Sequence, residues 1–251
     1  LGEQIDIHGG GEDLVFPHHE NEIAQSEAVS GKKFAKYWMH NAFLNIDNVK
    51  MSKSLGNFKT VRQISEQYDL QILRLFMLSA HYRSPLNFSA EMMESAKASL
   101  ERILTCMERL KDLAGKAQER ELNAAEEETL KSLETLVQKF ESSMEDDFNT
   151  ADALSAVFEM VKLANVSVTE ESAKELVSRV DETLRKLLDV LGILPERKKE
   201  TLDAEVEALI AERQAARKAR NFARADEIRN QLTEMGILLE DTREGVKWKR
   251  A

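Results

Sequence analysis

From Val61 onward, apolar residues recur at intervals of three and four, the spacing of one face of an α-helix. The pattern predicts two short helices over residues 61–68 and 70–82, followed by four long ones. Ser89 is placed to cap the first long helix and Gly115 to end it. Because each long helix has one apolar stripe and the links are short and polar, the four should pack as an antiparallel bundle. The first stripe consists of Met93, Ala96, Leu100, Ile103, Met107 and Leu110.

The chain beyond the bundle predicts a second, smaller helical part. Gly192 closes the last bundle helix, and residues 202–219 and 222–236 then form a pair of helices with Asn221 as the cap between them. Residues 237–248 alternate around a glycine turn, which predicts a terminal β-hairpin.

The first 60 residues read as a partial α/β unit. Ile5–His8 is a short apolar run that predicts a buried strand, and it ends in three glycines. A helix is predicted over residues 18–30 and a second strand, rich in aromatic and branched residues, over residues 37–46. The predicted fold class is therefore mainly α with a partial α/β unit.

Composition limits the function classes. A net charge of −10 argues against indiscriminate binding of nucleic acid. One cysteine, Cys106, excludes an internal disulfide framework and suits a reducing, cytoplasmic location. No apolar run is long enough to predict a membrane span. Since the chain starts at Leu1 and enters a strand at once, we expect it to be part of something longer.

His18 and Glu22 are a candidate metal-ligand pair. Residues four apart share one face of a helix, and zinc accepts an imidazole nitrogen and a carboxylate oxygen. Two ligands do not complete a site, and Cys106, inside an apolar helical stripe, is a poor third. The alternative is an exposed helix pair without a metal. His19 should turn toward the core or toward a neighbouring ligand instead.

The run Lys50-Met51-Ser52-Lys53-Ser54, with Gly56 just beyond it, is typical of a mobile loop that handles phosphates. The ammonium groups of Lys50 and Lys53 can offset charge that develops on transferring phosphates. The short side chains of Ser52 and Ser54 allow the loop to close over a nucleotide and reopen. A solvated loop is the alternative.

Gly9, Gly10 and Asp13 follow the first strand, at the strand end where open α/β sheets bind ligands. The glycines can admit a sugar or base closely, and Asp13 can accept hydrogen bonds from ribose hydroxyls. Glycine turns with an acidic residue are common, so the signal is weak by itself.

A series of arginines in the C-terminal helix pair is spaced to form a stripe, which can follow a phosphate backbone or can be a solvated face. Trp248 can stack on an unpaired base or pack the hairpin onto the helices. The stripe consists of Arg213, Arg217, Arg220 and Arg224.

Taken together, these stretches resemble the cysteinyl-tRNA synthetases, a family of class I aminoacyl-tRNA synthetases. The resemblance spans the chain, and its most specific part is the stretch from Phe16 to Glu22 followed by the lysine loop. It rests on residues 6–14, Phe16-Pro17-His18-His19-Glu20-Asn21-Glu22, Lys50–Asn57, His81-Tyr82-Arg83-Ser84, Asp146-Asp147-Phe148-Asn149-Thr150 and 241–250.

The resemblance implies a domain order. Residues 1–60 match the second half of a Rossmann-like class I catalytic domain, and residues 61–92 match connecting helices. Residues 93–195 match a helical bundle that braces tRNA(Cys), and residues 196–251 match a small domain for anticodon recognition, where the arginine stripe and Trp248 would lie.

It also implies roles for the residues above. His18 and Glu22 match two of four ligands of a zinc ion that binds the thiolate of substrate cysteine. Lys50 and Lys53 match the loop that stabilises ATP, bound with Mg²⁺, during adenylate formation. The glycines and Asp13 match a region bordering the adenosine. The implied activity is ligation of cysteine to tRNA(Cys) by a monomer.

The departures are informative too. The family's His-x-Gly-His motif is absent, and so are both zinc cysteines. We therefore expect no adenylation by this chain alone. Two alternatives stay open: a synthetase-like ligase that joins cysteine to an amino sugar, and a non-catalytic helical module that binds RNA. The predicted C-terminal hairpin favours tRNA over the amino sugar.

Overall fold

The computed structural model describes residues 2–52, 55–193, 201–218, 221–242 and 245–250. The chain divides into two compact units, Leu1–Glu196 and Arg197–Ala251. Both are mainly helical, as the periodicity predicts. Among the described helices, none combines the length and hydropathy needed to cross a bilayer.

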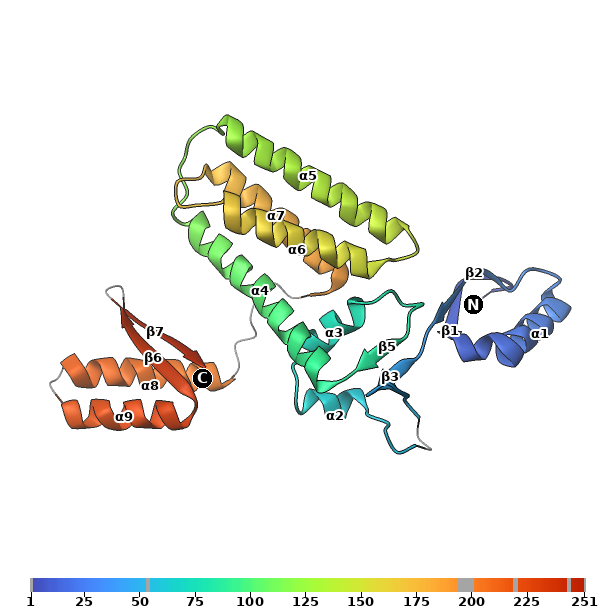
Figure 1. The fold of residues 1–251 in the computed structure, drawn as a ribbon, viewed down its shortest axis with the longest axis horizontal. Helices are drawn as coiled ribbons and strands as arrows, with labels where there is room; N and C mark the ends of the chain where they lie inside the picture. The colour runs from blue at the N-terminus through green and yellow to red at the C-terminus, as the bar shows by residue number, and fades with distance from the viewer. Residues whose placement is uncertain (1, 53–54, 194–200, 219–220, 243–244, 251) are drawn as a thin grey trace. The chain divides into compact units, whose positions relative to one another are not determined.

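The first unit begins with a parallel βαβ arrangement. Strand β1 (Ile5–Gly11) pairs with β2 (Ala35–Asn41), and helix α1 (Glu20–Ser30) lies in the connection between them. Two short helical turns, η1 (Glu12–Leu14) and the π-helical η2 (Val15–His19), lead from β1 into α1. This confirms the partial α/β unit. The parallel pairing places residues of two distant segments side by side at one edge (Figure 1).

The first predicted strand is wrong in two respects. It does not stop at His8, because β1 continues through all three glycines in register with β2. It is also not buried: Ile7 is 58% exposed, and Tyr37, which stands opposite it, is 68% exposed. In the described residues this sheet has two strands, and the positions of Ile7 and Tyr37 on it are open to solvent.

The second predicted strand, over 37–46, is in fact two strands in different sheets. β2 ends at Asn41, and the chain then enters β3 (Leu44–Ile46). β3 lies between β4 (Val49–Lys50) and β5 (Leu86–Phe88), a strand too short for the sequence pattern to reveal. The split occurs because the parallel partner of β3 comes from 42 residues further along the chain, with Leu44 opposite Leu86.

Two short helices follow, both shorter than predicted: α2 (Val61–Ser65) and α3 (Leu70–Leu78). Thr60 and Gln63 form a reciprocal capping box at the start of α2. α3 ends three residues before a tight turn at residues 81–84, where the Ser84 amide donates to the His81 carbonyl at 2.8 Å.

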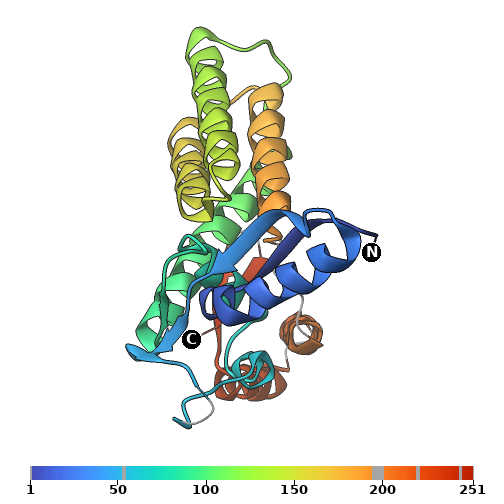
Figure 2. The same ribbon diagram turned by 90° about the vertical axis from the view of Figure 1, so that its right-hand side faces the viewer.

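Four long helices confirm the predicted bundle: α4 (Ala90–Ala114), α5 (Ala124–Glu145), α6 (Thr150–Ser167) and α7 (Lys174–Leu191). Figures 1 and 2 show α5, α6 and α7 packed side by side, with α4 running past them. Ser89 caps α4 through the amide of Met92, and Gly192 ends α7 in the left-handed conformation, as predicted. The largest fully buried side chains of the bundle are Met93, Ile103, Met107, Leu110, Met160, Leu176, Leu184 and Leu188.

The second unit has the predicted helix pair and hairpin. α8 (Thr201–Lys218) and α9 (Phe222–Glu234) pack together, and β6 (Ile237–Thr242) pairs antiparallel with β7 (Gly245–Arg250). The Asn221 side chain caps α9, which confirms that prediction. The core of the second unit is separate from that of the bundle and consists of Val206, Ile210, Ile228, Leu232 and Ile237.

Candidate active site

A group of histidines collects where β1, β2 and the start of α1 meet. β1 contributes one member and β2 another, while the turn into α1 contributes two and the first turn of α1 a carboxylate. Trp38 of β2 packs against them, its ring centroid 4.7 Å from that of His8. This histidine cluster comprises His8, His18, His19, His40 and Glu22.

Glu22 is held between two imidazoles. Its Oε2 accepts a hydrogen bond from His8 Nε2 at 2.7 Å, and its Oε1 lies 3.2 Å from His18 Nε2. A tetrahedral zinc ion with bonds of about 2.1 Å separates its ligand atoms by about 3.4 Å. The His18–Glu22 separation therefore suits two ligands of one ion, and the shorter His8–Glu22 contact suits a hydrogen bond that orients the carboxylate.

His19 has a different environment from His18. It is 4% exposed, and its Nδ1 lies 2.8 Å from Nε2 of His40, so one ring donates to the other. Burial, followed by the neighbouring His40, lowers the pKa of His19 and keeps its ring neutral at neutral pH. A β-carbon at Gly10 would lie 2.9 Å from Cε1 of His19. The glycine at this position thus makes room for a buried imidazole.

Sequence reasoning missed two members of the cluster. The ligand atoms of His8, His19 and Glu22 lie within 4.8 Å of one another, and His40 completes the contact with His19. His8 and His40 reach the site only through the parallel register of β1 and β2, which has no local signal.

Cys106 is a poor metal ligand, because burial raises the pKa of its thiol to about 11.

The lysine loop begins from a tight hairpin. Asp47 and Asn48 both have positive φ, of 48° and 65°, which turns β3 back into β4 and leads to Lys50. The Lys50 ammonium lies 3.4 Å from the centroid of the Phe43 ring. Lys53 and Ser54, two of the predicted ATP-binding residues, lie outside the described residues.

Asn57 ties the two ends of this loop together, a role that the sequence analysis missed. Its Oδ1 accepts from the amide of Ser52 at 2.9 Å, and its Nδ2 donates to the carbonyl of Lys50 at 3.2 Å. Asparagine commonly bonds to nearby backbone in this way, and its place directly after Gly56 was the available signal.

The glycines predicted to admit a nucleotide have packing partners in the described structure. A β-carbon at Gly9 would lie 3.1 Å from the carbonyl oxygen of Met39 on β2, and the space above Gly10 is taken by His19. Asp13 is exposed in the short turn after β1, with its carboxylate close to Gly11.

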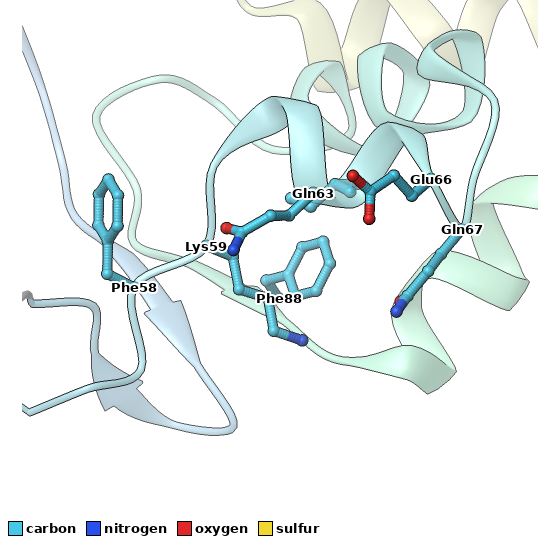
Figure 3. A pocket seen from close by; sticks show the side chains of 7 residues that line it. Phe58, Lys59, Gln63, Glu66, Gln67 and Phe88 are labelled. Atoms are coloured by element: carbon cyan, nitrogen blue, oxygen red, sulfur yellow. The ribbon is translucent and has the colours of Figure 1, made fainter.

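Directly after the lysine loop lies a cavity of about 300 Å³. Figure 3 shows Lys59, Gln63 and Phe88 close to one another, with Phe58 apart from them. The Lys59 ammonium is 5.4 Å from the centroid of the Phe88 ring. The cavity contains no residue of the histidine cluster, and its volume is at the low end for a ligand site.

The arginine stripe of the second unit is interrupted. Arg213 is 4% exposed, so it faces the interior of its unit and the predicted surface stripe is wrong at this position. Arg217 is exposed, and Arg224 is held by Glu212 and Glu227 at 2.9 to 3.0 Å. Arg220 and the side chain of Trp248 lie outside what the structure describes.

Three family models match consecutive parts of the chain. Residues 1–98 match the tRNA synthetases class I (C) catalytic domain, and residues 139–195 match the DALR domain. Residues 199–248 match the cysteinyl-tRNA ligase anticodon binding domain.

Curated relatives match the whole chain. The cysteine–tRNA ligases of Lachnospira eligens and Lachnoclostridium phytofermentans are each 59% identical to it, and that of Clostridioides difficile is 55% identical. The alignments cover 100% of this chain and 53% to 54% of each relative. The chain thus spans about half the length of the curated relatives it matches.

Solved structures agree at the level of the fold. A LeuRS of Agrobacterium radiobacter K84, in a ternary complex with tRNA and LeuAMS, matches 75% of this chain with a TM-score of 0.62 and 18% identity, over 25% of its own length. The methionyl-tRNA synthetase of Mycobacterium tuberculosis bound by methionyl-adenylate matches 74% with a TM-score of 0.59 and 18% identity, over 41% of its own length. With catalytic, DALR and anticodon-binding models in this order and whole-chain identity above half, the chain belongs to the cysteine–tRNA ligase family.

Proposed function

We propose that this chain forms part of an enzyme that activates cysteine with ATP and transfers it to tRNA(Cys). The carboxylate of cysteine displaces pyrophosphate from ATP, and a hydroxyl of tRNA(Cys) then displaces AMP. The observation that carries the proposal is the identity of 59% to cysteine–tRNA ligases over the full chain. We expect ATP to bind with Mg²⁺, and the enzyme to act as a cytoplasmic monomer.

His18 and Glu22 are the proposed metal ligands of this chain. Their ligand atoms have the separation expected in a tetrahedral site, and His8 orients the carboxylate by its hydrogen bond. A zinc ion there would supply a Lewis acid that prefers the thiolate of cysteine to the hydroxyl of serine. The resemblance implies thiolates as the other ligands, and because Cys106, the chain's one cysteine, is buried in the bundle, we propose that these thiolates come from outside this sequence.

Lys50 and Lys53 are proposed to stabilise negative charge on the phosphates of ATP, and of the two the structure describes Lys50. Its ammonium rests on the Phe43 ring, an interaction that it can exchange for a stronger one with the triphosphate. Asn57 keeps the described ends of the loop together.

The ATP role can be tested by pyrophosphate exchange in a full-length enzyme that contains this sequence. We expect Lys50→Ala to lower the exchange rate by about 100-fold, the loss typical of one removed charge-stabilising group. Lys59→Ala is the matched control, because it removes a nearby exposed ammonium beyond the loop. Equal rates for the two variants would contradict the assignment of Lys50.

The metal role is tested by zinc content after dialysis of the same full-length enzyme against a chelator. Glu22→Gln should lose zinc, whereas Glu20→Gln, an exposed carboxylate in the same helical turn, should retain it. If Glu22→Gln keeps one zinc per chain as firmly as the unmodified enzyme, Glu22 is not a ligand.

The acceptor is proposed to be tRNA(Cys), recognised by residues 93–195 and 196–251. The match of residues 199–248 to an anticodon-binding domain supports this over the amino-sugar ligase. The test compares binding of tRNA(Cys) and of an unrelated tRNA to this chain across salt concentrations. We expect preference for tRNA(Cys), and equal affinity at every salt concentration would place recognition elsewhere.

A further inference from the structure

The turn between α5 and α6 has a left-handed backbone, in which the amides of Phe148 and Asn149 bond to the carbonyls of Met144 and Ser143 near the end of α5, at 3.1 and 3.0 Å. Asp147 and Phe148 both have φ of +55°, a left-handed conformation that residues with a β-carbon seldom adopt. Phe148 is 51% exposed, so burial of its ring does not offset the strain. Strain of this kind persists only where surrounding contacts fix it.

Side-chain contacts to this turn come from the loop after α3. The Tyr82 hydroxyl donates to Oδ1 of Asp147 at 2.8 Å, and Arg83 Nε lies 2.6 Å from Oδ2. Arg83 Nε also donates to the Tyr82 hydroxyl oxygen at 3.1 Å, which closes the network. The hydrogen bond from Tyr82 lowers the pKa of Asp147, so the carboxylate is charged at neutral pH.

The same loop is bonded to the segment that precedes the lysine loop. The carbonyl of Tyr82 accepts from the amide of Ala42 at 2.9 Å. The next residue, Phe43, accepts from the amide of Leu86 at 3.1 Å, and its ring carries the Lys50 ammonium. A continuous series of contacts therefore runs from the bundle to Lys50.

We propose that Tyr82 and Asp147 are positioning residues for the lysine loop: they anchor residues 81–84 to the bundle and thereby fix Ala42, Phe43 and the resting place of Lys50. The proposal depends on the proposed function for its catalytic consequence. Neither residue touches the phosphates. Their effect passes through the backbone of residues 42–43.

Kinetics of the full-length enzyme separate this role from a merely structural one. Tyr82→Phe removes only the hydroxyl, and we expect the KM for ATP in pyrophosphate exchange to rise about tenfold or more, the factor for a lost hydrogen bond to a charged group. The KM for cysteine should stay within twofold, because the histidine cluster is not touched. Tyr68→Phe, at a partly buried tyrosine packed on the core, is the matched control.

Hydrogen exchange of this 251-residue chain provides a test that needs no activity. Tyr82→Phe and Asp147→Asn should each speed amide exchange over residues 42–51 about tenfold, and Tyr68→Phe should not. Unchanged exchange in both variants, or an unchanged KM for ATP in an active enzyme, would overturn the proposal. If the unmodified full-length enzyme catalyses no pyrophosphate exchange, only the proposed function is refuted. The hydrogen-exchange measurement still decides whether Tyr82 and Asp147 anchor residues 42–51.

Discussion

Glu126 is a carboxylate with a side chain only 8% exposed, at the first turn of α5. Arg120 donates to both of its oxygens at 2.7 and 2.8 Å, and the amides of Asn123 and Ala173 donate at 3.0 and 2.9 Å. These bonds lower the pKa of Glu126 from 4.5 to about 2, and the bond from Arg120 has the largest effect. A single residue thus caps α5 and joins it to the start of α7.

Glu126→Gln should destabilise the chain by about 2 to 3 kcal/mol, below the cost of a fully buried pair because Arg120 keeps a third of its side chain exposed. Since the folded pKa is the lower one, this stabilisation is complete above about pH 4.5 and is lost as the pH falls toward 2. Urea unfolding at several pH values measures it. Glu119→Gln, in an exposed pair with Lys174, should change little, and a pH-independent difference for Glu126→Gln would contradict the account.

Gly10 is a second residue whose role is defined by one neighbour. Gly10→Ala would place a methyl group against the buried His19 ring, which is held by His40, and we expect a loss of about 1 to 3 kcal/mol. Gly115→Ala is the control, because its φ of −75° is ordinary and its nearest atom is 3.6 Å away. Urea unfolding followed by Trp38 fluorescence, with Trp248 replaced by Phe, compares them. Equal midpoints for the two variants would show that the ring can move aside.

At the scale of elements, α3 is joined to the end of α7. Arg74 Nε of α3 donates to the carbonyl of Leu191 at 2.6 Å, where the last carbonyls of the helix have no intrahelical donor. Gly192 then turns the chain with φ of +63°, and a β-carbon there would lie 2.5 Å from Nη2 of Arg74. A cation at a helix C-terminus also interacts favourably with the helix dipole.

We expect Arg74→Met to cost about 1 to 2 kcal/mol, because a carbonyl at the helix end loses a charged donor. The measurement is thermal unfolding followed by circular dichroism, with Arg62→Met on the neighbouring α2 as an exposed control. High salt should not abolish the difference, since the contact is partly buried. A loss no larger than that of Arg62→Met would mean that the two helices are held by apolar packing alone.

At the scale of the whole molecule, the residues that the structure describes form two hydrophobic cores. One belongs to residues 1–196 and contains the bundle, and the other, around Ile228 and Leu232, belongs to residues 197–251. A unit of this second size buries a smaller fraction of its surface on folding and should be the less stable of the two.

Calorimetry should therefore resolve two unfolding transitions. Ile228→Ala, at a fully buried position of the second core, should lower the free energy of unfolding of the second unit by about 2 to 5 kcal/mol and shift only its transition. Leu184→Ala in the bundle should shift only the transition of the first unit. Each variant controls for the other, and a common shift of both transitions would show that the two units unfold together.

Helical periodicity and end signals were sufficient for most of the fold. The stripe between Ser89 and Gly115, the cap at Asn221 and the stop at Gly192 all predicted real boundaries, because they act within a few residues of one another. β5 was missed because three residues carry no period. Burial of Ile5–His8 was predicted wrongly, since an apolar strand does not reveal how many strands surround it.

Within the candidate site, sequence patterns were enough to predict that His18 and Glu22 share one helical turn and to single out the lysine loop, because ligands one helical turn apart and a run of five residues are local features. The presence of His8 and His40 in the histidine cluster, the burial of Arg213 and the packing of His19 against Gly10 became visible only in the folded chain. Those outcomes depend on strand register and on the packing of segments tens of residues apart. Such contacts are set by the free energy of the whole fold, and no short stretch of sequence specifies them.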